Sequence, residues 1–553
     1  MCPRIVCSLL IALALPAHAQ SLPSFFNSND VERYLPTPNL PVDAYRPDAP
    51  AAVIESPPAE QGLFMSTEIA VSGVRIEGGT VYELEALAPV FQPVIGKTVA
   101  LSELIELTRS ITQRYVTDGY PLSYAFMPEQ RFTDGVVRVV LVEGYVADYE
   151  IEGDVGPVSD KIRAFADKIR GERPLTKRTF ARYSSLLNTL PGVTVVAEVP
   201  PPGTTDGATR MLLKAQRKTF TSSMNLATSS RDGAQAFFTL SSQARTSLAE
   251  QISLSALVPP GEDKESYYRI DYSQLLGSEG LQLAASASRF RARLKDTIQL
   301  ADGFELSQRR HNERFSLGAK YPLIAAPETW WSLGAQLYGV NDKALYELKG
   351  YDFDFDDPNN IRALGVETDW RSATARQMRV LSFGLYQGLN VLGAKTSVAD
   401  KNFFRLRAYG LQSDRYGENW QGVISLSGFW SDDPLPQSEQ AIYGGQNFAR
   451  GYPTDQASGD TGWGAAYEFN YSLRRDSTWL RLLQPYVVAD MARTGFNLPG
   501  LRGAKLSSFA AGLRLGDSRY YNVALEAAKP MSDKALDSRN RSVRYTFSFS
   551  YQL

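Results

Sequence analysis

The stretch Val543-Arg544-Tyr545-Thr546-Phe547-Ser548-Phe549-Ser550-Tyr551-Gln552-Leu553 alternates apolar and polar side chains without a break. A period of two is typical of a β-strand whose two faces meet different surroundings. About 10 residues is also the length that a tilted strand needs to span a bilayer. The sequence stops on this aromatic-rich strand, as we expect where a last strand closes a barrel.

Similar alternating segments follow one another from residue 218 onward. We count about 16 of them, each about 10 residues long, with starts near residues 219, 234, 250, 265, 280, 313, 331, 361, 376, 401, 419, 462, 484, 503, 520 and 542. Connections after even-numbered segments are short, whereas several after odd-numbered segments are long, such as Arg291–Asn312, Asn341–Asn360 and Trp430–Thr461. This pattern predicts an all-β transmembrane barrel of 16 antiparallel strands over residues 218–553.

A soluble β-sandwich would alternate as well, because one face of each of its sheets is solvated. The ends of the apolar faces favour the barrel. They carry large aromatic side chains, as the girdles at the two membrane interfaces do. These aromatics are Trp331, Trp370, Trp420, Trp463 and Tyr471.

The N-terminus has the parts of a secretory signal peptide, which we place at residues 1–19. Arg4 supplies the positive start, Ile5–Leu15 the apolar stretch, and Ala17-His18-Ala19 a cleavage site of small residues. The chain is therefore predicted to leave the cytoplasm.

The region between the signal and the barrel divides into three parts. Residues 20–66 are rich in proline and are expected to form an extended linker. Within it, both a short plug helix from about Asn27 to Tyr34 and a tether without structure fit the sequence. Residues 67–145 and 146–217 both have the pattern of small β-α-α-β-β modules, and their similar plan indicates duplication.

The composition contains few of the residues that are commonest in catalytic and metal sites. The only cysteines, Cys2 and Cys7, lie in the signal, and His311 is the only histidine outside it. No G-x-S-x-G motif occurs, and the acidic run at 352–357 lacks the glycine and final glutamate of a calcium loop. We therefore expect no enzyme, cofactor or metal site. The formal net charge of -2 excludes a polybasic nucleic-acid binder.

Signal peptide, proline-rich linker, two small α+β modules and a 16-strand barrel together resemble the outer-membrane transporters of two-partner secretion, in the Omp85 superfamily. The chain is similar to hemolysin-activator and filamentous-hemagglutinin transporters, and its two modules look like their POTRA domains. The motif residues that carry this resemblance are Tyr115, Gly119, Tyr120, Pro128, Gln130, Gly135, Glu143 and Gly144 in the first module, and Pro191 and Gly192 in the second.

The resemblance implies an outer-membrane translocator whose POTRA domains, in the periplasm, recognise an unfolded exoprotein that then crosses the barrel. The partner would be a secreted adhesin, hemolysin or contact-dependent toxin. Outer-membrane lipids and the barrel assembly machinery would be further partners, and nucleic acid would not. Two alternatives remain open: an Omp85-type assembly factor, which usually has more POTRA domains, and a passive porin-like channel, which would lack them.

The resemblance also implies an anchor for a loop inside the barrel. Arg450-Gly451-Tyr452 looks like the family's R-G-Y/F tip of the sixth long loop, which folds into the lumen. Its family partner is an aspartate on strand thirteen. Here Asp490 shares the inward parity of that strand, although the family's neighbouring aromatic and glycine are absent. Glu468, inward on strand twelve, is a second candidate partner.

Overall fold

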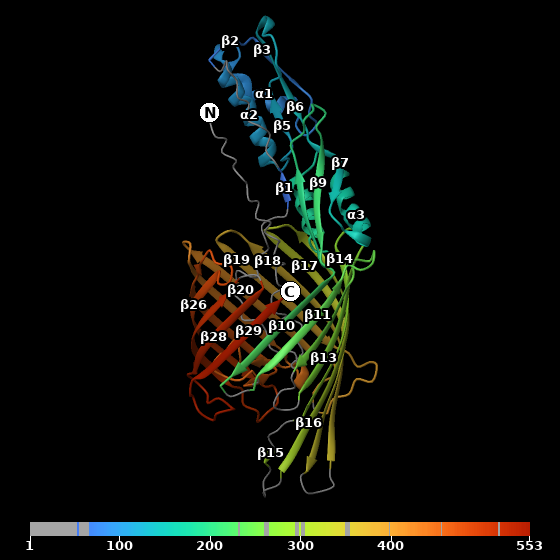
Figure 1. Ribbon diagram of the computed structural model, residues 1–553, viewed down its shortest axis with the longest axis vertical. Coiled ribbons are helices and arrows are strands. Elements are labelled where there is room, and N and C mark those ends of the chain that lie inside the picture. Colours follow the sequence, from blue (N-terminus) through green and yellow to red (C-terminus); the bar gives the residue numbers. More distant parts are fainter. Residues whose placement is uncertain are drawn as a thin grey trace, which may run out of the picture.

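A computed structural model describes residues 52–54, 66–230, 233–258, 265–293, 298–299, 305–348, 354–397, 399–454, 456–517 and 520–553. The predicted signal peptide and the short helix considered near Asn27 lie outside these residues. No helix in the described part of the chain is long and apolar enough to cross a membrane. Figure 1 shows two small modules stacked on one end of a wide barrel.

The barrel is closed and has sixteen antiparallel strands, which confirms the predicted fold class. The first strand, β10, pairs with the last, β29, from Ser223↔Gln552 to Ser229↔Thr546. The main strands are β10 Phe220–Ser229, β11 Gln235–Gln243, β12 Gln251–Val258, β13 Ser266–Leu276, β14 Leu281–Arg293, β16 Glu305–Ala325, β17 Thr329–Leu348, β18 Asp354–Ala373, β19 Gln377–Gly388, β20 Phe404–Tyr416, β21 Trp420–Trp430, β24 Thr461–Tyr471, β26 Leu482–Gly495, β27 Lys505–Gly516, β28 Tyr521–Pro530 and β29 Arg544–Gln552. Two short strands, β15 Ile298–Gln299 and β25 Leu473–Arg474, extend the sheet.

Alternation along each strand separates an apolar outer surface from the inner face of the barrel. On β26 the side chains of Val487 and Met491 are exposed on the outside, whereas Val488 and Asp490 are buried. The same division holds on β16, where Phe315 and Leu317 are among the most exposed apolar side chains. Sequence parity therefore assigns a strand residue to the inner or the outer face of the barrel.

Two of the predicted long loops are largely strand, so that prediction was wrong. Most of Arg291–Asn312 and Asn341–Asn360 belongs to β14, β16, β17 and β18, which project beyond the barrel wall (Figure 1). Polar side chains occur on both faces of these extensions, so they lose the alternation that marks a membrane strand. Backbone pairing holds them together, and the buried Arg310–Asp342 ion pair, at 2.6 Å, links β16 to β17.

The first small module packs two helices against a three-stranded sheet in the order β3-β6-β5. The expected first strand is split in two, because the chain turns between Ala70 and Gly73. The elements are β2 Glu68–Ala70, β3 Gly73–Glu77, α1 Leu84–Phe91, β4 Thr98–Ala100, α2 Leu101–Thr117, β5 Tyr124–Phe126 and β6 Val136–Val142. The apolar faces of α1 and α2 close over the sheet and form its core.

The second module repeats this plan, with a sheet in the order β1-β8-β9-β7. Its elements are β7 Tyr145–Glu152, α3 Ser159–Arg170, α4 Lys177–Leu187, β8 Val193–Val199 and β9 Ala208–Arg217. The strand β1, Ala52–Ile54, comes from the segment expected to be an extended linker, and it pairs in parallel with β8. One edge of this sheet is therefore covered by the chain itself.

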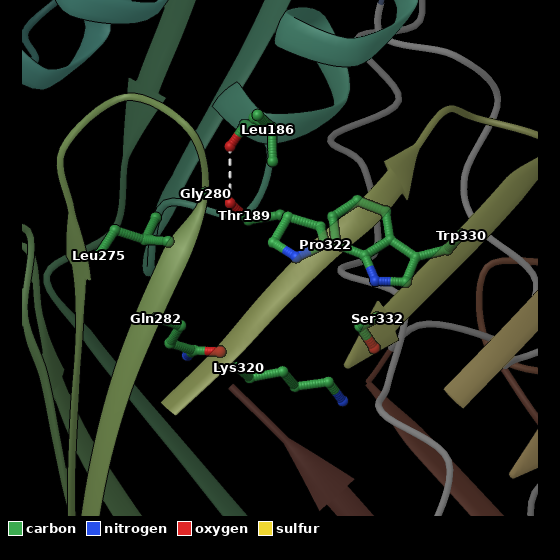
Figure 2. A pocket seen from close by; sticks show the side chains of 9 residues that line it. All are labelled: Leu186, Thr189, Leu275, Gly280, Gln282, Lys320, Pro322, Trp330 and Ser332. Carbon is green, nitrogen blue, oxygen red and sulfur yellow. Dashed lines mark hydrogen bonds between the residues drawn. The ribbon is translucent and has the colours of Figure 1, made fainter. Parts of the chain in front are cut away.

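The second module is docked on the barrel through the turns between strands. Its core continues into Leu275 and Ala325 at the barrel rim. A cavity of about 160 Å³ remains at the junction, with Leu186 and Thr189 on the module side and Pro322 and Trp330 on the barrel side (Figure 2). The module and the barrel thus share a continuous apolar contact, and this fixes their relative orientation.

Candidate functional site

The described part of the long connection between β21 and β24, residues 431–454 and 456–460, lies inside the barrel and is called the lumen loop below. It contains a short 3-10 turn at Gln437–Glu439 and a hairpin of β22 Ala441–Tyr443 with β23 Ala457–Gly459. Its apolar side chains join those of the barrel wall in one buried cluster. The loop therefore packs against the wall like a small core.

The tip of the lumen loop is a tight turn built around Arg450. Ala449 adopts a positive φ of 61°, and the backbone N–H of Tyr452 donates to the Ala449 carbonyl at 3.0 Å. A Cβ on Gly451 would lie 2.6 Å from the backbone nitrogen of Pro530 on β28, so this close approach requires glycine. The Gly451 N–H donates to the Ser508 hydroxyl of β27 at 3.1 Å.

The Arg450 side chain is paired with two glutamates from different strands. Its guanidinium lies 2.7 Å from the Glu526 carboxylate on β28 and 3.4 Å from that of Glu468 on β24. The exposed fractions of these side chains are 12% for Arg450, 4% for Glu526 and 8% for Glu468. Because the cation is buried, loss of its counter-charges is costly, about 3–5 kcal/mol for a buried pair.

Asp490 contacts Arg450 through the backbone, which differs from the predicted pairing of side chains. Its carboxylate accepts the Arg450 backbone N–H at 3.0 Å and also the Ser508 hydroxyl. Asp490 therefore holds the turn, while Glu526 and Glu468 hold the guanidinium. Sequence reasoning missed Glu526, although its inward parity on β28 was a readable signal.

A further arginine supports the glutamates from the wall. Arg514 on β27 lies 2.6 Å from Glu468, and its guanidinium stacks over the Tyr486 ring at 4.0 Å. The Tyr486 hydroxyl in turn donates to Glu526 at 2.9 Å. Contacts within the wall thus also hold both glutamates in place, and such preorganisation lowers the cost of ordering the site.

A second anchor holds the lumen loop at another sector of the wall. Glu439, whose side chain is fully buried at 0% exposure, forms an ion pair of 2.7 Å with Arg405 on β20. The Tyr338 hydroxyl on β17 donates to the Glu439 carboxylate at 2.8 Å. Sequence reasoning did not single out Glu439. The loop is therefore fixed at two separate points.

Within the first module, the buried Tyr115 and the half-buried Glu143 bind each other. The Glu143 carboxylate accepts the Tyr115 hydroxyl at 3.0 Å and the backbone N–H groups of Thr80 and Val81 at 2.7 and 2.8 Å. Burial opposes ionisation of Glu143, but these hydrogen bonds and that of the Thr80 hydroxyl outweigh it and lower its pKa. The pKa of Tyr115 is raised, by burial first and then by the adjacent carboxylate.

Family models match both parts of the chain. The POTRA domain of ShlB type matches residues 69–144. The model of the haemolysin secretion/activation protein ShlB/FhaC/HecB matches residues 221–515, which is more than half of the chain. The chain belongs to the ShlB/FhaC/HecB family. It is an outer-membrane β-barrel transporter of two-partner secretion, and transporters of this kind have a secreted protein as partner.

Relatives of this ShlB/FhaC/HecB transporter extend over most of its length. The Heme/hemopexin transporter protein HuxB of Haemophilus influenzae strain 86-028NP is 20% identical over 475 residues, covering 83% of this chain and 82% of that protein. The structure of CdiB from Escherichia coli has a TM-score of 0.66 at 18% identity and covers 90% of this chain and 93% of its own. CdiB from Acinetobacter baumannii has a TM-score of 0.60 at 14% identity, covering 94% of each chain. At these identities the solved structures show the fold.

The other POTRA motif residues are placed at turns and junctions. Gln130 pairs through its amide with both backbone groups of Arg138 on β6, at 2.7 and 2.9 Å. Gly135 and Gly144 pass so close to neighbouring carbonyls that a Cβ would clash. Tyr120 packs edge-on against Tyr115, Gly119 accepts the Lys177 N–H at the start of α4, and Pro128 is half-buried beyond β5.

The motif at the end of α4 lies where the second module meets the barrel. Pro191 is half-buried, and Gly192 has a φ of 65°. The Gly192 carbonyl accepts the Lys218 N–H at 2.7 Å, and a Cβ there would lie 2.7 Å from the Gln243 side chain of β11. Among the described residues, no group of three or more His, Cys, Asp or Glu is placed to hold a metal ion.

Proposed function

We propose that this transporter exports an unfolded exoprotein through its lumen, with its modules in the periplasm capturing the cargo and the lumen loop closing the path at rest. The observation that carries the proposal is the loop itself, which packs on the inner wall of the barrel and is held by Arg450 at its tip and Glu439 near its base. A wide barrel without such a plug would leak solutes. An anchored loop can block the lumen and still be displaced, because its contacts with the wall are non-covalent.

Cargo recognition is proposed to use a strand edge of a POTRA sheet. An extended chain adds to such an edge through backbone hydrogen bonds, and neighbouring pockets give selectivity. The β8 edge already carries β1, and Thr112 of α2 occupies the β5 edge, where its hydroxyl bonds the Ala125 N–H at 3.0 Å. The eight-residue strand β7 is the outer strand on the other side of the second sheet, so it is the edge we assign to the cargo.

The proposed class of cargo is supported by the family and by chemistry. A partner that enters unfolded and folds outside would be prevented by its own folding from sliding back. Repeated β-coils suit this because each coil stacks on the previous one. An adhesin, a hemolysin or a contact-dependent toxin fits this description. Insertion of the transporter by the barrel assembly machinery belongs to the same proposal.

The first test compares culture supernatants of a deletion strain with those of the parent strain. Export of one large protein should be lost, and plasmid-borne transporter should restore it. Arg450→Ala should not restore it, although its barrel still shifts on a gel between unboiled and boiled samples. Normal export by Arg450→Ala over a time course would remove the loop anchor from the proposal, and identical supernatants would favour a porin.

The second test locates the cargo on the POTRA domains. A photo-crosslinking residue at Ala147, exposed on β7, should capture the cargo during export. The same residue at Arg109, exposed on α2, is the matched control and should not. Continued export with crosslinks only at Arg109 would contradict the β7 assignment.

A further inference from the structure

Five cations gather on the outer face of the barrel, beyond its membrane band, and form what we call the outer cationic patch: Arg289, Arg291, Arg293, Arg309 and Lys343. They come from three neighbouring strands, β14, β16 and β17. Cross-strand register places them side by side, since Arg293 is opposite Arg309 and Arg291 is opposite His311, which is opposite Lys343. All five therefore face the same way.

The patch begins where the lipid-facing apolar surface ends. On β16 the exposed side chains of Leu317 and Phe315 are followed on the same face by Glu313, His311 and Arg309. On β13, Tyr268 is 61% exposed and lies directly opposite Arg289. An aromatic side chain at this boundary is typical of the interface between the hydrocarbon and the headgroups. The patch thus occupies the headgroup level and the space just above it.

Among the described residues, three of the five cations in the patch are paired with acids, and two are not. Three cations have acidic partners on the same face: Arg289 with Glu313 at 3.3 Å, Arg309 with Glu347 at 2.9 Å, and Lys343 with Asp356 at 2.7 Å. Arg291 and Arg293 are exposed and have no ion-pair partner within the described ranges. On the opposite, inner face of the same strands, by contrast, Arg310 is buried and paired with Asp342. The guanidinium groups of Arg291 and Arg293 therefore lie exposed on the outer face.

We propose that the outer cationic patch binds the phosphate groups of phosphorylated glycolipids in the outer leaflet of the membrane. Arginine presents a planar fork of donors that matches phosphate oxygens, and cations beside a charged bilayer surface add to lipid binding. The acyl chains of the same lipid would lie along Phe315 and Leu317. This assignment rests on the proposed orientation. In that orientation the end of the barrel opposite the POTRA domains faces the outside of the cell.

The experiment measures binding of bis-phosphorylated lipid A to the purified full-length transporter in detergent micelles. The double variant Arg291→Gln/Arg293→Gln should bind about 30-fold more weakly. Arg291→Lys/Arg293→Lys keeps the charge and should stay within a few-fold of the parent protein. The control Arg109→Gln/Arg210→Gln removes the same charge from exposed POTRA positions and should bind as the parent does.

Two further arms identify the ligand. Lipid A without phosphates should bind the parent protein no better than the phosphorylated lipid binds Arg291→Gln/Arg293→Gln. Inorganic phosphate at millimolar concentration should not compete, because it lacks the acyl chains. Equal binding by the parent and Arg291→Gln/Arg293→Gln would overturn the proposal, as would full competition by free phosphate. Since no cargo is present, a failure here is distinguishable from a failure of export.

Discussion

The Arg450 guanidinium forms its shortest ion pair, 2.7 Å, with Glu526 of β28. Asp490 receives only the backbone N–H of that arginine. The two acids therefore have different tasks, one electrostatic and one conformational. Neutralising Glu526 and neutralising Asp490 should therefore have different effects on export.

We expect Glu526→Gln to impair export by roughly tenfold or more, because it removes the main counter-charge of a buried cation. Asp490→Asn should export nearly normally, since its amide oxygen still accepts the Arg450 N–H. The measurement is the rate of cargo appearance in the medium, with the gel shift as a check of barrel assembly. Adding Glu526→Gln to Arg450→Ala should do no further harm, because the pair is already lost. A stronger defect in Asp490→Asn than in Glu526→Gln would contradict this division.

The pair of Glu439 with Arg405 predicts that the lumen loop has a second, independent restraint. We expect Glu439→Gln to leave the tip anchored but to free the base of the loop, since Arg405 loses a fully buried counter-charge. Single channels in planar bilayers should then open more often than those of the parent protein.

Combining Glu439→Gln with Arg450→Ala should release the loop and raise conductance by more than the sum of the single changes. Lys320→Gln is the control, because Lys320 pairs with Asp369 at an exposed site on the barrel. Exposed pairs contribute at most about 1 kcal/mol. Conductance traces of Glu439→Gln that match those of Lys320→Gln would show that the second anchor does not restrain the loop.

The lowered pKa of Glu143 predicts an acid-sensitive first POTRA domain. An acid whose pKa is lower in the folded state stabilises the fold fully above its unfolded value, about 4.3. That stabilisation is lost as the pH falls through the folded value. Hydrogen exchange at the amides of Thr80 and Val81, corrected for intrinsic rates, should therefore accelerate below about pH 4.

Glu143→Gln should remove this pH dependence and exchange faster already at neutral pH. Glu106→Gln is the matched control, because Glu106 is an exposed acid on α2 that pairs with Arg109. Its pH profile should follow that of the parent protein. A parent protein with the same protection at pH 3 and pH 6 would refute the role of Glu143.

The sequence predicted the features that depend on the local alternation of side chains. It missed those that depend on how distant segments meet in three dimensions. Strand parity found Asp490 and Glu468 on the inner wall, because the side of a strand is a local property. It could not rank Glu526 above Asp490, since that order depends on the angle at which the loop tip enters. Nor could it find that β1 pairs with β8, because a short paired segment in a proline-rich stretch has no period to read. The hairpin extensions of β14, β16, β17 and β18 were predicted as loops because they too lack a regular alternation of side chains.

The junction between the second POTRA domain and the barrel depends on Glu279, in the turn between β13 and β14. Its carboxylate lies 2.8 Å from Lys168 of α3 and accepts the Tyr183 hydroxyl of α4 at 3.2 Å, with Arg182 at 3.7 Å. The hydrogen bond from Lys168 is the main cause of its lowered pKa. We expect Glu279→Gln to weaken docking by up to about 1 kcal/mol, because the group is partly exposed.

A weaker dock should widen the range of POTRA orientations without unfolding either part. Spin labels at Asp160→Cys and Arg376→Cys report this, and the sequence after the predicted signal contains no other cysteine. Their distance distribution should broaden in Glu279→Gln, and in the parent protein as the pH falls through the lowered pKa of Glu279. Lys214→Gln breaks a similarly exposed pair, with Glu198, inside the same domain and should leave the distribution unchanged. Equal widths in Glu279→Gln and Lys214→Gln would mean that the apolar contact alone sets the orientation.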